Sequence, residues 1–80
     1  MDIIANLIEM ATLSDKIHAS VERDDDIDTN DWDRLEDLID AYRGWQRMRG
    51  YIPTHVKVED TWLAHYEIIA NAQWLFDNAA

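Results

Sequence analysis

Apolar residues recur at three- and four-residue spacing over three stretches of this chain, and the pattern predicts three amphipathic helices. An acidic linker separates the first two helices, and a connector containing Pro53 precedes the third. The expected segments are a helix over about 2–22, a linker over 23–29, a helix over about 30–49 and a helix over about 57–78. The sequence therefore predicts one all-α domain over residues 1–80, a small three-helix bundle.

Residues that begin and end helices stand near these bounds. Asp2 is expected to cap the first helix, because an Asp side chain accepts a hydrogen bond from a free N–H of the first turn. The second helix has three candidate caps, Asp28, Thr29 and Asn30. Gly50 is expected to end that helix.

The third predicted helix is apolar on two sides, and two interpretations are open. Its main core face is expected to contain Val58, Trp62, Tyr66, Ile69, Gln73 and Phe76, and a second stripe contains Ala64, Ile68, Ala72 and Leu75. Either this helix is central and touches both others, or the second stripe forms a dimer interface through Ile68 and Leu75. The alternation over 55–58 resembles a strand, but we find no partner strand for it.

Four tryptophans are available to fill a core that is small in an 80-residue domain. We expect them mainly to fill this core, since each aromatic ring can bury about 150–250 Å². The alternative is that some serve as exposed interface anchors. Trp74 is the best candidate for that role, because it lies off the main apolar axis.

Charge is distributed unevenly along the chain. There are 17 Asp and Glu against 7 Lys and Arg, a formal net charge of −10. Residues 22–40 hold ten acids and two bases, a net −8, whereas residues 41–57 hold four bases and no acid. The acidity excludes a simple nucleic-acid binder and polybasic docking to a membrane. The basic cluster Arg43, Arg47 and Arg49 is expected to pair with the acidic segment of the same molecule or of a second copy.

Like charges follow one another on the outer face of the second predicted helix. Asp33 and Asp37 are four residues apart, a spacing at which like charges repel, and Glu36 and Asp40 repeat it. As a solvated face, these carboxylates would keep a small protein soluble. As a recognition surface, they would resemble the charge spacing of a phosphate backbone and would engage a basic surface on a partner protein.

The acidic run before this helix extends the candidate surface. The full partner-binding set is Asp24, Asp25, Asp26, Asp28, Asp33, Glu36, Asp37 and Asp40. In its size, acidity, aromatic content and lack of cysteine, the chain resembles the small phage-encoded inhibitors of host defence, such as anti-CRISPR and anti-restriction proteins. This resemblance is one of type and rests on no shared motif. It implies a protein that blocks a nucleic-acid-binding complex by charge mimicry or steric exclusion; the alternative is an assembly module that homodimerises through the third helix.

Motifs for metal binding and catalysis are incomplete. Asp26, Asp28 and Asn30 match three ligand positions of a calcium-binding EF-hand loop, but Asp31 stands where that loop requires glycine. His18 falls within the apolar arc of the first helix, where a hydrogen-bonded boundary histidine is expected. Since the chain also lacks cysteine and a phosphate-binding loop, we expect no metal, no cofactor and no enzymatic activity.

The first residues carry acids rather than the basic segment of a secretory signal. No apolar run approaches the roughly 18 residues of a membrane span. We therefore expect a cytoplasmic protein without a membrane partner.

Overall fold

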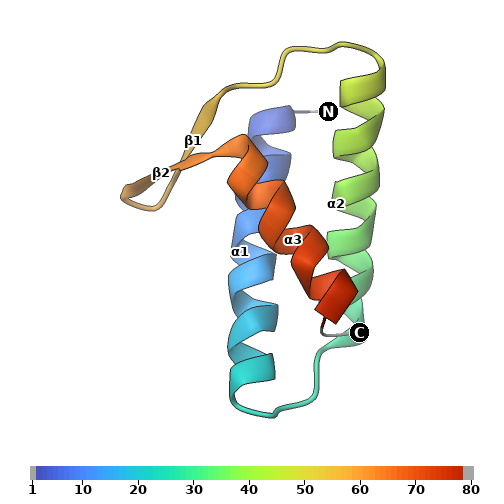
Figure 1. Cartoon of the computed structure of the whole chain (residues 1–80), viewed down its shortest axis with the longest axis vertical. Coiled ribbons are helices and arrows are strands. Elements are labelled where there is room, and N and C mark those ends of the chain that lie inside the picture. Colours follow the sequence, from blue (N-terminus) through green and yellow to red (C-terminus); the bar gives the residue numbers. More distant parts are fainter. Residues whose placement is uncertain (1, 79–80) are drawn as a thin grey trace.

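Three helices and one β-hairpin make up the computed structural model, which describes residues 2–78 (Figure 1). The element order is α1 (Ile3–Glu22), α2 (Thr29–Arg47), β1 (His55–Val58), β2 (Thr61–Ala64) and α3 (His65–Asn78). The first two helices are confirmed to within two residues of their expected bounds. Residues 1, 79 and 80 of the expected domain lie outside the described residues.

The long helices α1 and α2 run in opposite directions, and α3 crosses them obliquely (Figure 1). Helix α1 packs extensively against both other helices, whereas α2 and α3 meet over few residues. The interpretation of the third helix as the central one is therefore wrong. Because α1 has apolar residues on a broad arc, it is the helix that can contact two neighbours at once.

Aspartate caps begin both long helices. The Asp2 carboxylate accepts from the Ile4 N–H at 3.0 Å, as expected, and Asp28 is the second cap, accepting from the Asn30 N–H at 2.9 Å. Since the Asp28 side chain is engaged at the start of α2, the loop that precedes it is tied to the helix.

Both long helices end with the same paired backbone hydrogen bonds, a Schellman motif. After α2, the Gly50 N–H donates to the Trp45 carbonyl at 3.0 Å and the Arg49 N–H donates to the Gln46 carbonyl at 3.1 Å. Arg49 takes the left-handed conformation of the motif, with φ 53°. After α1, Asp24 takes it with φ 57°. Gly50 thus follows the helix end by two residues rather than adopting the left-handed conformation itself.

The expected all-α class is wrong in one segment, because residues 55–64 form an antiparallel hairpin instead of the start of the third helix. His55 pairs with Ala64 and Val58 with Thr61, which leaves a two-residue turn at Glu59 and Asp60. The missing partner for the strand pattern at 55–58 is the segment that follows it directly. Helix α3 consequently begins at His65 rather than near residue 57.

The core lies where α1 meets α2, α3 and the first strand. Its largest fully buried side chains are Leu7, Met10, Ile17, Leu35, Leu38, Ile68 and Leu75. The stripe of α3 that was expected to be secondary is therefore its core face. Trp62 and Tyr66, which were expected on the core face, are 65% and 63% exposed.

The expectation that the tryptophans mainly fill the core is also wrong. Trp62 and Trp74 are exposed, and Trp32 and Trp45 are only half-buried at the edge of the core. Trp32 stacks on Phe76 with ring centroids 4.2 Å apart, which closes the α2–α3 contact. The core is thus built mainly from Leu, Ile, Met and Ala side chains.

Candidate functional site

The outer face of α2 lies opposite the side chains that this helix buries, Leu35, Leu38, Ile39 and Tyr42. Its first half carries four exposed carboxylates, Asp33, Glu36, Asp37 and Asp40. Within residues 2–78, no Lys, Arg or His nitrogen lies within 4.0 Å of these four carboxylates. Their mutual repulsion is therefore not relieved by ion pairs in the chain itself.

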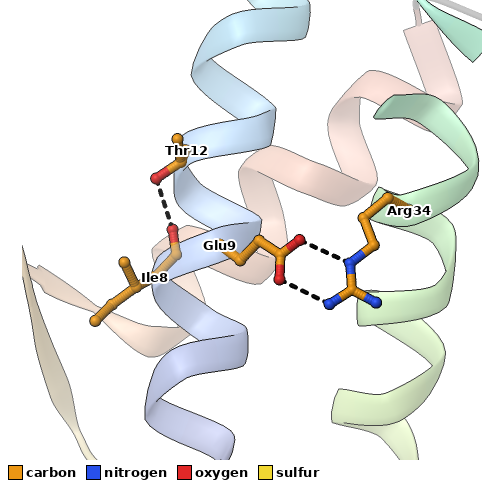
Figure 2. Close-up of polar contacts among 4 residues, drawn as sticks. All are labelled: Ile8, Glu9, Thr12 and Arg34. Atoms are coloured by element: carbon orange, nitrogen blue, oxygen red, sulfur yellow. Dashed lines mark hydrogen bonds and ion pairs between the residues drawn. The ribbon is translucent and has the colours of Figure 1, made fainter. Parts of the chain in front are cut away.

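Two cations, Arg34 and Lys16, are engaged at the seam between α1 and α2. Arg34 donates to Glu9 through two nitrogens, at 2.7 and 2.8 Å (Figure 2). Lys16 forms an ion pair with Asp31 at 2.7 Å. The hydrogen bonds from Arg34 lower the pKa of Glu9, and the hydrogen bond to Asp31 raises the pKa of Lys16. Both cations thus join α1 to α2, and the charge of Asp37 adds a weaker attraction to Arg34 that helps to raise the pKa of Arg34.

The loop between α1 and α2 carries the acidic run Asp24, Asp25, Asp26 and Asp28. This acidic loop lies at the end of the molecule where α2 begins (Figure 1). Asp25 pairs with Arg23 at 2.9 Å, and Asp28 caps α2. Asp24 and Asp26 are exposed and have no cation within 4.0 Å among the described residues. The loop leads directly into α2, so its exposed carboxylates precede the acidic half of that helix along the chain.

The basic cluster occupies the other end of α2. Arg43 donates to the Gln73 side chain on α3, and Arg47 donates from Nε to the Arg43 carbonyl at 3.4 Å. Arg49 lies in the helix-ending motif. All three are exposed, and within residues 2–78 none forms an ion pair. The length of α2 separates them from the acidic loop, so the expected pairing between the two within one molecule does not form.

The proposed second interface is only partly on the surface. Ile68 and Leu75 are 2% and 1% exposed and belong to the core between α3 and its neighbours. They are therefore not available to a second copy while the chain is folded, and the choice of these two as interface residues is wrong. Trp74, in contrast, is 48% exposed, and its ring meets the edge of the His18 ring at 5.8 Å.

Two exposed aromatic side chains near the hairpin were missed as candidate binding residues. Trp62 pairs across the hairpin with Lys57, on the exposed side of the strands, and Tyr66 lies in the first turn of α3. Trp and Tyr dominate the binding energy of many protein interfaces. The available signal was the strand-like alternation of 55–58, which predicts that every second residue of a paired strand faces outward.

A hollow of about 340 Å³ lies between α1 and α3. It is lined by Ser14, Asp15, His18, Asn71, Trp74 and Leu75. His18 pairs with Glu22 at 3.1 Å, but its side chain is 49% exposed, so the histidine is hydrogen-bonded as expected and does not lie at the core boundary. The Ser14 hydroxyl oxygen is buried without a hydrogen-bond partner. Among residues 2–78, no group of three or more His, Asp or Glu side chains is arranged to hold a metal ion.

Comparison with protein-family models, with curated proteins and with solved structures finds no match for this chain. In the part of the chain that the structure describes, no helix combines the length and apolar character needed to cross a membrane.

Proposed function

We propose that this chain is a small, non-enzymatic protein-binding module whose acidic surface engages a basic surface on another protein. The observation that carries the proposal is the set of four exposed and unpaired carboxylates on the outer face of α2. Charge left unpaired within a fold remains available to an external partner, and it accelerates encounter with a surface of opposite sign.

The spacing of these carboxylates supports a more specific form of the proposal. The four charges from Asp33 to Asp40 span seven residues, about 10 Å of helix at 1.5 Å per residue. This gives one charge per about 3.5 Å, close to the 3.4 Å per charge along one strand of duplex DNA. A helix held rigid by its core contacts can present this row to a groove that normally holds nucleic acid. The proposed activity is inhibition of such a partner, as in the phage-encoded inhibitors that the chain resembles.

Charge reversal tests the proposal directly. The variant Asp33→Lys, Asp37→Lys, Asp40→Lys should lose a partner captured from the native host, while its circular dichroism spectrum remains that of the folded protein. The matched control Glu59→Lys, Asp60→Lys, Glu67→Lys changes the net charge equally but away from this face, and it should retain the partner. Equal capture by both variants would refute the acidic surface as the binding site.

Competition distinguishes charge mimicry from steric exclusion. If the row of carboxylates replaces a phosphate backbone, duplex DNA should displace the captured partner, and moderate salt should weaken the complex steeply. A complex that resists both treatments would point to the exposed aromatic side chains Trp62 and Tyr66 instead. In that case, alanine at these two positions should abolish capture.

A further inference from the structure

The outer face of α2 continues beyond its acidic half along a single stripe. Asp33, Asp37, Asp40, Gly44 and Arg47 follow one another at spacings of three and four residues, so they lie one above the other on the side opposite the core. The stripe thus runs from carboxylates, through a residue without a side chain, to a guanidinium group. A second such stripe in the antiparallel direction has the opposite order of charge.

Gly44 has no explanation within the monomer. A glycine inside a helix costs about 1 kcal/mol relative to alanine. A Cβ atom added at Gly44 would have no atom within 4 Å outside its own helix turn, so no close contact in the chain requires glycine there. Gly44 instead lines an apolar hollow of about 420 Å³ on the surface, together with Ala41, Trp45, Met48 and Gly50. Met48 at its rim is 83% exposed.

We infer that a second copy of this chain packs antiparallel against the outer face of α2. The register follows from the stripe: a twofold axis on the outer face, level with position 42 along the helix, sets Asp37 of each copy against Arg47 of the other and Asp40 across from Gly44. The contact is isologous, because the same face serves on both copies and the contact closes after two chains. Asp37, which repels its neighbour Asp33, then gains a cation that its own chain does not supply.

The balance of charge sets the strength of this dimer. Each chain carries a net charge of −10, which opposes association at long range. At about 0.15 M salt the screening length is about 8 Å, so distant carboxylates are screened while the contacting pairs still attract. One helix face is smaller than the roughly 800 Å² per partner of a standard interface. The dimer is therefore reversible and depends on concentration.

Charge swaps test this arrangement with the purified chain alone, in sedimentation velocity at about 0.15 M salt. Asp37→Arg places two arginines at each contact and Arg47→Asp places two aspartates there, so each variant should associate at least about tenfold more weakly than the unmodified chain. An equimolar mixture of the two variants should associate again, as should the double variant Asp37→Arg, Arg47→Asp. Only a contact between positions 37 and 47 of different copies gives this reciprocal rescue.

Matched controls separate the contact from net charge. Asp77→Arg and Lys57→Asp make the same charge changes on α3 and β1, and both should sediment as the unmodified chain does. Gly44→Leu should weaken association by obstructing the close approach, whereas Ala70→Leu on α3 should not. An unmodified chain that is monomeric at all concentrations, or swaps without rescue, would overturn the inference. Because Asp33, Asp37 and Asp40 also belong to the surface proposed to engage a basic partner, a second copy and that partner would compete for one face. A chain that stays monomeric overturns only the dimer, since capture of the partner is measured separately.

Discussion

At the scale of single side chains, Leu75 and Trp62 illustrate that burial, rather than size, determines how much a side chain contributes to the free energy of unfolding. Leu75 lies in the core of α3 and Trp62 lies on the exposed side of the hairpin. We expect Leu75→Ala to lower the free energy of unfolding by about 2–5 kcal/mol, because it removes buried methyl groups and leaves a cavity. Trp62→Ala should change it by about 0.5 kcal/mol or less. Urea denaturation of the two variants measures both values, and a larger loss for Trp62 would contradict its place on the exposed side of the hairpin.

The Glu9–Arg34 pair provides a pH-dependent contribution at the same scale. Its hydrogen bonds lower the pKa of Glu9 from the ordinary value of 4.5. Because the folded state binds this proton less readily than the unfolded chain, the contribution is complete above the ordinary pKa and is lost as pH falls through the lowered one. It is modest, since both side chains are about half-exposed.

A double-mutant cycle isolates that contribution. With Glu9→Gln, Arg34→Gln and the double variant, the coupling free energy should favour the folded state at pH 7 and vanish in acid, below the pKa of Glu9. Coupling that persists unchanged once the carboxylate is protonated would show that packing of the two side chains, rather than charge, joins α1 to α2.

At the scale of elements, Gly44 within α2 and Gly50 just after it should respond in opposite ways to substitution by alanine. A Cβ atom at Gly50 would lie 2.1 Å from Cε3 of Trp45, so Gly50→Ala must displace that ring and should cost about 1–3 kcal/mol. A Cβ atom at Gly44 meets open space, so Gly44→Ala should raise the free energy of unfolding by about 1 kcal/mol through helix propensity. Thermal denaturation of the two variants checks the signs, and equal signs would contradict the packing at the end of α2.

The same scale separates what the sequence could predict from what it could not. Helices α1 and α2 were predictable because a cap and the apolar spacing agree at the start of each, and Gly50 stands near the end of α2. The hairpin was not, because its turn lacks the glycine or asparagine that marks two-residue turns; Glu59 adopts φ 57° there instead. Trp62 and Tyr66 also stand four residues apart, a spacing typical of a helix face. A strand of four residues depends on its partner, and tertiary contacts decide its structure.

At the scale of the whole molecule, the separation of acidic and basic segments was predictable from the sequence. Which acids form ion pairs with which bases was not. Counting acids and bases located the acidic surface, since each exposed side chain of α2 follows from helix geometry. Whether Arg34 would turn toward Asp37 or toward Glu9 depended on how α1 and α2 pack, and the structure has it on Glu9. That choice leaves the outer carboxylates without an ion pair among the described residues.

Unpaired like charges on one helix face destabilise the folded chain, and this cost is measurable. At about 0.01 M salt the screening length is about 30 Å, comparable to the molecule, and at about 0.15 M it falls to about 8 Å. We therefore expect the melting temperature to rise with salt over this range, because repulsion among the acids weakens. For a domain of this size, each kcal/mol corresponds to about 4–8 °C.

Neutralising the stripe should remove most of that dependence. Asp33→Asn, Asp37→Asn, Asp40→Asn should melt at a higher temperature than the unmodified chain in low salt and should respond less to added salt. Glu59→Gln, Asp60→Asn, Glu67→Gln removes the same number of charges from scattered positions, so its salt dependence should stay closer to that of the unmodified chain. Scanning calorimetry at concentrations where sedimentation shows monomers makes the comparison. Equal salt dependence in both triple variants would mean that the repulsion comes from net charge alone and not from the stripe on α2. The stripe would then have no stability cost of its own, which would remove one argument that it is retained for binding a partner.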